Sequence, residues 1–334
     1  MARLIDGSWH SGDIVTSSAR GEFLRPDSRF RDWIDGTAEL PEGARTVPAE
    51  ADRFALYVAW ACPWAHRTMM VRALYGLEAA LPIGIVAPDM LADGWIFDDD
   101  HPDPFYGHRF LREAYVRSDP KATSKVTVPV LWDLKRHCIV SNESSEIIRM
   151  LAGPLARVAG RHTAPFAGVD LRPEPLRAEI DAWNDRIYDT VNNGVYRCGF
   201  ARSQAAYAEA ATALFETLDA LEARLRDQRW IVGNTFTEAD LRLFPTLVRM
   251  VPVYHGHFKV NLKDLRVDYP ALWGWVHDVY QLPTVAETIN MPETRRHYYY
   301  SHERINPYRI VPLGPQVDYR GAHGRAVLGP SPVG

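Results

Sequence analysis

Cys62 is the residue whose surroundings most favour chemistry. It follows a short apolar run, residues 54–59, and precedes Pro63, a residue that fits the first turn of a helix. A thiol at the start of a helix lies near unpaired N–H groups and the positive end of the helix dipole, which can lower its pKa from about 8.5 to between about 3.5 and 7.5. We therefore interpret Cys62 as a nucleophile at neutral pH. The alternative is a buried cysteine that serves only as a small apolar residue.

Ala65 stands where a Cys-x-x-Cys motif would place its second cysteine. No internal disulfide can form there, so a mixed disulfide between Cys62 and an outside thiol must be resolved by a second outside thiol. The other cysteines, Cys138 and Cys198, are widely spaced along the chain. This spacing argues against a disulfide framework and against a paired-cysteine metal site, and it indicates a reducing compartment.

Val128 and Pro129 begin a second apolar run. Proline supplies no N–H, so at the start of a strand it leaves the backbone of Val128 available to a peptide-like ligand, and the bond between the two residues is a candidate for cis geometry. Further along, Glu143 and Ser144 mark the expected start of a helix. A carboxylate there can bind an ammonium group, while a hydroxyl and helix amides can bind a carboxylate, which together suit an amino-acid head group. The alternative for both residues is simple helix capping.

Aromatic side chains form a third signal. Tyr196 is the first of these residues. Tyr298 and Tyr299 belong to a separate aromatic group within residues 297–302. Phenols can hydrogen-bond the oxygens of a ring substrate and stack on its face, whereas the alternative is that these residues belong to the core of a helical domain. Two histidine pairs, His255 with His257 and His297 with His302, have no carboxylate or thiol at a ligand spacing beside them, so we expect no metal site.

The elements that position these residues differ between the two halves of the chain. The first half is expected to contain strands over residues 54–59, 83–86, 128–132 and 138–140, a helix from 63 to about 75 that Gly76 ends, and a helix from about 142 that ends before Gly153. Residues 1–50 are polar without a sustained period, which indicates an irregular arm over the surface, and residues 88–125 are expected to form an irregular insert.

The second half is expected to be helical. Residues 153–175 are rich in Gly, Pro, Ala and Arg, which is typical of a linker. Beyond them, apolar residues at every third or fourth position predict a helix over 203–227, and Thr237 with Asp240 predicts the capped start of another. Residues 269–280 predict one more helix, and after Pro283 we expect a short helix and a tail rich in Pro and Gly.

The composition is that of an ordinary globular protein of about two domains: 334 residues, of which 46 % are hydrophobic and 24 % charged. The 38 basic and 42 acidic residues give a formal net charge of −4, so no strong field favours nucleic acid or an anionic membrane, and a small-molecule or protein partner is expected. The first residues lack the apolar run of a secretory signal, and no stretch approaches the roughly 20 apolar residues of a transmembrane helix. We therefore expect a cytoplasmic protein.

In combination, the Cys-Pro turn between strand and helix, the Val-Pro strand, the Glu-Ser helix start and the helical second half resemble a glutathione transferase. Separate stretches are more specific and resemble the glutathionyl-hydroquinone reductases, also called the Xi class: residues 54–67, 126–133, 139–150, 192–201 and 297–307. The arm is similar as well, because Phe23, Arg25 and Trp33 match the pattern of that family's amino-terminal extension. The resemblance covers residues 1 to about 315.

This resemblance implies an α/β plus all-α fold class, with a thioredoxin-like amino-terminal domain followed by a helical glutathione-transferase domain. The implied parts are an amino-terminal extension over residues 1–50, a glutathione-binding domain over 51–155, an all-helical domain over 173–290 and a carboxy-terminal extension over 291–334. A homodimer is implied too.

The resemblance also implies which residues bind glutathione. Cys62 would be the catalytic thiol, and Val128, next to Pro129, would be the backbone partner of the glutathione cysteine. The remaining contacts would be made by Glu143 and Ser144 to the γ-glutamyl group, by Trp95 covering the glutathione, and by Lys125, where many relatives have Arg. Tyr196 and Tyr299 would face the hydroquinone, with Tyr298 as the alternative to Tyr299.

The implied activity is the glutathione-dependent reduction of a glutathionyl-hydroquinone, an aromatic thioether, to the hydroquinone. Cys62 would take up glutathione in a mixed disulfide, and a second glutathione would release it as oxidised glutathione. Glutathione is thus a co-substrate, and no metal is required. Two alternatives stay open: an omega-type thioltransferase or dehydroascorbate reductase, and a non-catalytic binding module of the same fold.

Overall fold

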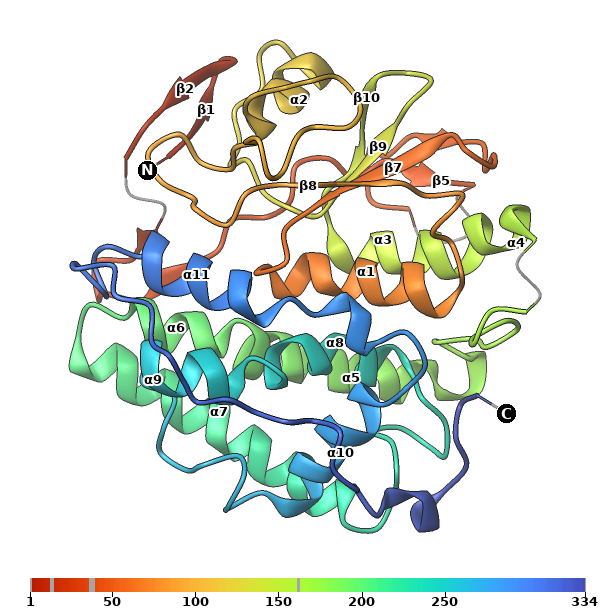
Figure 1. Ribbon diagram of the computed structural model, residues 1–334, viewed down its shortest axis with the longest axis vertical. Helices are drawn as coiled ribbons and strands as arrows, with labels where there is room; N and C mark the ends of the chain where they lie inside the picture. The colour runs from red at the N-terminus through yellow and green to blue at the C-terminus, as the bar shows by residue number, and fades with distance from the viewer. Residues whose placement is uncertain (1, 13–14, 36–39, 161–162, 334) are drawn as a thin grey trace. The chain divides into compact units, whose positions relative to one another are not determined.

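The computed structural model describes residues 2–12, 15–35, 40–160 and 163–333 of the chain (Figure 1). By its internal contacts the chain divides into two compact units. Unit 1 consists of residues 1–14, 26–167 and 288–297, and unit 2 consists of residues 15–25, 168–287 and 298–334. Segments of the amino-terminal arm therefore contribute to both units.

Unit 1 is built around a mixed sheet. Its strands are β1 (Arg3–Ile5), β2 (Ser8–His10), β5 (Trp33–Ile34), β6 (Thr46–Val47), β7 (Phe54–Val58), β8 (Ile83–Ile85), β9 (Val130–Asp133) and β10 (Cys138–Ser141). Its helices are α1 (Pro63–Leu74), α2 (Leu111–Ser118), α3 (Ser144–Met150), the π-helical segment η1 (Leu151–Leu155) and α4 (Ala156–Ala159). Helix α11 (Met291–Ser301) and the 3₁₀ segment η5 (Ala286–Thr288) have residues in both units.

The central sheet has the strand order β10-β9-β7-β8. β7 pairs with β8 in parallel and with β9 antiparallel, and β9 pairs with β10 antiparallel. All five residues of β7 are buried, as an apolar run in a central strand requires. Helices α1 and α3 pack against each other on one side of the sheet, while α2 lies on the other side (Figure 1). This is the thioredoxin-like arrangement that the sequence predicted.

The boundaries of α1 follow from its end residues. Cys62 is the N-cap and Pro63 occupies the first turn, where a missing N–H costs nothing. At the other end Gly76 adopts φ +63° and donates its N–H to the carbonyl of Ala73 at 3.1 Å, a left-handed stop that glycine adopts without strain. The predicted start and stop of this helix are confirmed.

The prediction of an irregular insert over residues 88–125 is wrong at α2. There Leu111, Ala114 and Tyr115 are buried at a helical spacing, and the carboxylate of Glu113 accepts the N–H of Phe110 at 2.8 Å to cap the helix. The helix is short and its other positions are polar, so its apolar period spans too few residues to stand out in the sequence.

The predicted end of a helix before Gly153 is confirmed for α3, which ends at Met150, but the sequence did not predict that the helical path continues beyond it. After α3 the chain continues through η1, which contains Gly153 and Pro154, and then through α4 to a left-handed Gly160 at φ +62°. A π-helical turn accommodates a proline because its wider hydrogen-bond pattern tolerates the missing N–H. Of the predicted linker, residues 161–162 lie outside the described residues.

The amino-terminal arm is more ordered than its sequence indicates. β1 and β2 form an antiparallel pair, as do β3 (Thr16–Ser17) and β4 (Phe23–Leu24), while β5 and β6 pair in parallel. Strands of two or three residues carry no detectable period, which is why the sequence predicted an irregular arm. Residues 1, 13–14 and 36–39 of this region lie outside the described residues.

Unit 2 is mainly helical. Its helices are α5 (Arg177–Ile187), α6 (Gly194–Phe200), α7 (Gln204–Leu225), α8 (Glu238–Leu247), α9 (His255–His257) and α10 (Pro270–Tyr280). The π-helical segments η3 (Tyr188–Asn192) and η4 (Met250–Tyr254) and the 3₁₀ segments η2 (Glu174–Leu176) and η6 (Arg325–Leu328) complete it, together with β3 and β4.

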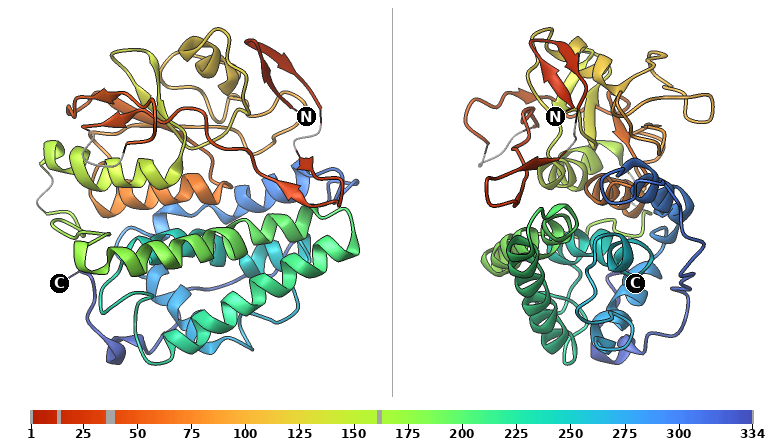
Figure 2. Two further views of the ribbon diagram at one scale, coloured as in Figure 1. Left: turned by 180° about the vertical axis from the view of Figure 1, so that it is seen from behind. Right: turned by 90° about the vertical axis from the view of Figure 1, so that its left-hand side faces the viewer.

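The predicted helices of unit 2 are confirmed. α7, green in Figure 2, packs against α6 and α10, and its N-cap Ser203 accepts the N–H of Ala206 at 3.2 Å. Thr237 and Asp240 form the predicted capping box of α8, in which the Asp240 carboxylate accepts the N–H of Thr237 at 3.0 Å. Burial raises the pKa of the Asp240 carboxyl to about 6.

Arg325 is one of several side chains whose contacts hold the carboxy-terminal tail in unit 2. The buried guanidinium of Arg325 donates to the carbonyls of Leu225 at 3.0 Å, Ala271 at 3.1 Å, Gln228 at 2.7 Å and Arg229 at 2.9 Å. Leu225 is the last residue of α7, and Gln228 and Arg229 follow that helix, so Arg325 satisfies carbonyls that have no partner inside a helix. Within the part of the chain that the structure describes, no helix combines the length and apolar character needed to cross a membrane.

Candidate functional site

The thiol of Cys62 lies at the start of α1, half-buried, in contact with two backbone groups. Its Sγ accepts the N–H of Ala65 at 3.4 Å, and its S–H donates to the carbonyl of Val128 at 3.3 Å. The first contact is a helix-start interaction that favours negative charge on sulfur. The second uses the S–H as a donor and therefore favours the protonated thiol.

Val128 is brought to the thiol by the sheet. The peptide bond between Val128 and Pro129 is cis, and pairing of β9 with β7 begins only at Val130, opposite Tyr57 near the end of β7. The backbone of Val128 therefore lies outside the strand ladder and beside the turn that holds Cys62. This is the position that the sequence predicted for a backbone available to a ligand.

Glu143 and Ser144 lie at the start of α3. One oxygen of the Glu143 carboxylate accepts the N–H of Ser145 at 3.0 Å, and the other accepts the hydroxyl of Ser28 at 2.9 Å. Burial raises the pKa of the Glu143 carboxyl, but the hydrogen bonds from Ser145 and Ser28 and the charge of Arg67 outweigh it and lower the pKa below its ordinary value. Glu143 thus caps the helix, as the alternative interpretation held, and it does so as an ionised carboxylate.

Ser144 is buried, and its hydroxyl accepts a hydrogen bond from the guanidinium of Arg67 at 3.3 Å. Arg67 is 2 % exposed and its Cζ lies 4.5 Å from the ring centroid of Trp64. An ionised carboxylate, a hydroxyl and a buried guanidinium therefore occupy one part of unit 1. Ser28 and Arg67 were not found from the sequence. Arg67 is a charged residue within the predicted helix, and Ser28 lies in the arm, which has no sustained period.

Trp95 and Lys125 are the other predicted glutathione contacts in unit 1. Trp95 is buried and its ring stacks on that of His297, with the centroids 4.8 Å apart and 18° between the planes. His297 is held in turn by the carbonyl of Pro88, 2.9 Å from its Nδ1. Lys125 is half-buried in the segment that leads to Val128.

Unit 2 holds a chain of three phenols. The hydroxyl of Tyr196 lies 2.7 Å from that of Tyr298, which lies 2.9 Å from that of Tyr254. Tyr254 and Tyr298 are fully buried, and burial raises the pKa of both phenols well above the ordinary value, so both stay neutral. Tyr196 is half-buried. Tyr254 was not found from the sequence, because a tyrosine within a mostly apolar stretch looks like a core residue.

Tyr299 lies on the same helix as Tyr298 but in a different setting. It is half-buried, its hydroxyl is 3.5 Å from the carbonyl of Val253, and its ring centroid is 4.6 Å from that of His257. It is Tyr298 whose hydroxyl contacts Tyr196. Between the two adjacent tyrosines, the structure thus places Tyr298 in the phenol chain.

His257 and His302 form a buried pair, with Nε2 of the first 3.0 Å from Nδ1 of the second. At this distance one imidazole donates and the other accepts, an arrangement that needs no metal. Among the described residues, no group of three or more His, Cys, Asp or Glu side chains could hold a metal ion.

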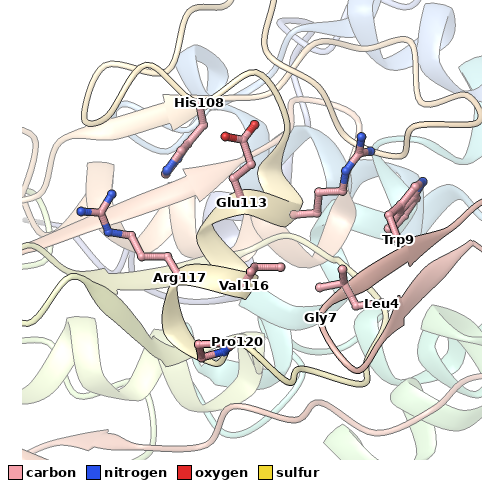
Figure 3. A pocket seen from close by; sticks show the side chains of 9 residues that line it. Leu4, Gly7, Trp9, His108, Glu113, Val116, Arg117 and Pro120 are labelled. Atoms are coloured by element: carbon pink, nitrogen blue, oxygen red, sulfur yellow. The ribbon is translucent and has the colours of Figure 1, made fainter.

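Unit 1 also has an open groove of about 450 Å³ beside the β1–β2 hairpin and α2 (Figure 3). Figure 3 shows Trp9 and Leu4 on the side of the hairpin and Glu113, Val116 and Arg117 on α2. None of the described residues that line it is a predicted site residue. The groove is therefore separate from the thiol.

Comparisons with known proteins identify the family of this chain. Residues 61–153 match the family model of the glutathione S-transferase N-terminal domain, and residues 204–278 match that of the C-terminal domain. The chain is 48 % identical to the glutathionyl-hydroquinone reductase YqjG of Escherichia coli K-12, over 98 % of this chain and 99 % of that protein. It is 45 % identical to the glutathionyl-hydroquinone reductase PcpF of Sphingobium chlorophenolicum, over 94 % of this chain and 96 % of that protein.

Solved structures are similar over almost the whole chain. The glutathione-bound structure of YqjG from Escherichia coli K-12 superposes with a TM-score of 0.86 at 45 % identity and covers 97 % of this chain and 99 % of that one. The Xi class glutathione transferase of Natrialba magadii superposes with a TM-score of 0.87 at 40 % identity, covering 99 % of this chain and 98 % of that one.

The three cysteines should differ in their reactivity toward iodoacetamide at pH 7. Burial raises the pKa of the Cys198 thiol to about 12 and that of the Cys138 thiol above its ordinary value, whereas Cys62 has the helix-start N–H. We expect Cys62 to be alkylated at least about tenfold faster than Cys138, with Cys198 unmodified. Mass spectrometry of peptides from timed samples measures the three rates. Faster labelling of Cys138 than of Cys62 would contradict the activated thiol.

Proposed function

The chain belongs to the glutathione transferase superfamily and, within it, to the glutathionyl-hydroquinone reductases of the Xi class, and on this premise we propose that it reduces glutathionyl-hydroquinones with Cys62 as the nucleophile. The observation that carries the proposal is the thiol at the start of α1, which has a helix N–H at 3.4 Å and Ala65 in place of a resolving cysteine. Such a thiol forms a mixed disulfide that only an outside thiol can resolve.

The reaction has two steps. In the first, the Cys62 thiolate attacks the sulfur of the glutathionyl-hydroquinone, a disulfide bond forms, and the bond between sulfur and the ring carbon breaks with its electron pair on carbon. That carbon takes a proton and the hydroquinone leaves. In the second step, the thiolate of another glutathione attacks the mixed disulfide, which releases oxidised glutathione and restores the Cys62 thiolate. Glutathione is oxidised and the ring carbon is reduced, so no other electron donor is required.

We assign glutathione to residues 51–155. The ionised Glu143 would bind the ammonium of the γ-glutamyl group, while the Ser144 hydroxyl and the charge of Arg67 would bind its carboxylate. The backbone at Val128 and Pro129 would pair with the cysteine of glutathione, and its amide would take over the carbonyl that holds the Cys62 proton. Trp95 and Lys125 would cover the rest of the tripeptide, as the family resemblance implies.

We assign the ring to the phenols of residues 173–290 and of the extension 291–334. Tyr196 would donate its hydroxyl to the leaving hydroquinone, and Tyr298 would hold Tyr196 in place through the 2.7 Å contact. Tyr299 would contact the ring from the same helix. A thioltransferase of small disulfides needs no such set of phenols, so the phenol chain favours the reductase over the omega-type alternative.

Replacing Cys62 by Ser should lower the reductase rate by about a thousandfold or more, because serine does not form the mixed disulfide. Without added glutathione, the wild type should release hydroquinone once and carry one glutathione adduct on Cys62, which intact-mass analysis detects. With glutathione it should turn over and produce oxidised glutathione. The matched control is Cys138→Ser, which should keep full activity. Hydroquinone release by Cys62→Ser at the wild-type rate would refute the mechanism.

Replacing Tyr196 by Phe should slow the release of hydroquinone by about a hundredfold, which is the usual contribution of a positioned proton donor. The same variant should reduce a mixed disulfide of glutathione and 2-mercaptoethanol at nearly the wild-type rate, since that substrate has no ring. Stopped-flow measurements of both substrates give the comparison. Equal slowing of the two reactions would mean that Tyr196 has no ring-specific role.

We also propose that the protein acts as a homodimer in the cytoplasm. Its three cysteines form no disulfide, which fits a reducing compartment, and the apolar side chains Tyr308, Ile310 and Leu313 of the carboxy-terminal extension are exposed and would be covered by a second copy. Light scattering should give the mass of two chains, and the double replacement of Ile310 and Leu313 by Ser should give that of one. The control is Val267→Ser, an exposed apolar residue elsewhere in unit 2. A single-chain mass for the wild type would reject the dimer.

A further inference from the structure

The β3–β4 hairpin of the amino-terminal arm is fixed to the backbone of unit 2. The N–H of Arg202 donates to the carbonyl of Gly21 at 2.9 Å, and the hydroxyl of Ser203 donates to the carbonyl of Arg20 at 2.9 Å. Gly21 has φ +86°, and a Cβ there would lie 3.1 Å from the carbonyl carbon of Arg202. The approach is close enough to require glycine, so the hairpin has a defined position on this unit.

From that anchor the arm reaches Tyr196. Phe23 in β4 is buried, and its ring lies 6.2 Å from that of Tyr196, with 29° between the planes, and 5.5 Å from that of Phe200. Phe258 packs on Tyr196 at 5.5 Å. Tyr196 thus contacts several aromatic rings, one of which, that of Phe23, belongs to the arm.

Arg25 follows directly after this contact. Its Cζ lies 4.9 Å from the ring centroid of Tyr196 and 5.3 Å from that of Phe23, a cation–π distance in both cases. Its Nε–H donates to Oδ1 of Asn193 at 2.6 Å, and Asn193 is the N-cap of α6, the helix of Tyr196. The guanidinium therefore bridges the arm to the helix that carries the phenol.

The other end of Tyr196 is also held, because its hydroxyl contacts that of Tyr298 at 2.7 Å. We propose that Arg25 is a positioning residue for Tyr196, which makes the amino-terminal arm a part of the reductase site. The inference rests on the proposed function. With the ring under the guanidinium and the hydroxyl in contact with that of Tyr298, the phenol oxygen of Tyr196 is held in one position for proton transfer. The guanidinium also stabilises the charge that develops on the phenol oxygen as the proton leaves.

The test compares Arg25→Ala, Arg25→Lys and wild type on two substrates, a glutathionyl-hydroquinone and the ring-free mixed disulfide of glutathione and 2-mercaptoethanol. Arg25→Ala should lower kcat for the hydroquinone substrate by about tenfold with little change in KM, because the effect is on the proton transfer. It should leave the rate with the ring-free disulfide unchanged. Arg25→Lys keeps a cation over the ring and should recover most of the loss.

The matched control is Arg20→Ala in the same hairpin, whose guanidinium lies 3.8 Å from Glu22 and 3.7 Å from Glu209. This variant should behave as wild type on both substrates. Equal loss on both substrates, or loss in Arg25→Ala that Arg25→Lys does not relieve, would show that Arg25 only supports folding and would overturn the inference. Unchanged rates in Arg25→Ala would also overturn it. If the wild type itself fails to act on the glutathionyl-hydroquinone, the proposed function falls, and that outcome is distinct from all of these.

Discussion

The pairing of β7 with β9 is the constraint on which the rest of unit 1 depends. Because the two strands run antiparallel, the start of β9 lies beside the end of β7, where the chain turns into α1. That pairing brings the carbonyl of Val128 to within 3.3 Å of the Cys62 sulfur, although the two residues are far apart in the sequence. A nucleophile at a helix start and a backbone acceptor beside it follow from strand order alone, before any other side chain is considered.

Burial separates the roles of the phenols in unit 2. Tyr254 and Tyr298 are fully buried. Water cannot reach their hydroxyls to solvate the charge that ionisation would create, so both hydroxyls stay protonated. Tyr196, half-buried at the end of the chain of hydroxyls, is the member that water or a ligand can reach. Each hydroxyl has a single proton to donate, so in each of the two contacts one tyrosine donates and the other accepts.

Local rules predicted what depends on near neighbours in the sequence. The cap at Cys62, the stop at Gly76 and the period of α7 each need only a few adjacent residues, and all were predictable. The continuation of the helical path through Gly153 and Pro154 was not predictable, because packing selects the π-helical turn that tolerates both residues. Ser28, Arg67 and Tyr254 were missed for the same reason: their partners lie on other elements. Tyr298 and Tyr299 differ by about 100° around one helix, and only the packed structure shows which side faces Tyr196.

The hydrogen bonds of Arg325 affect which residues around it can be substituted during evolution. Its guanidinium donates hydrogen bonds to four main-chain carbonyl oxygens, those of Leu225, Gln228, Arg229 and Ala271. A carbonyl is the same group whatever side chain it accompanies, so the identities at those four positions are free to vary as far as this contact is concerned. The guanidinium has no substitute, because no other side chain carries enough donors in a fixed plane. At these four contacts selection therefore acts on Arg325 itself, and a search for covarying residue pairs would not detect the four carbonyl partners.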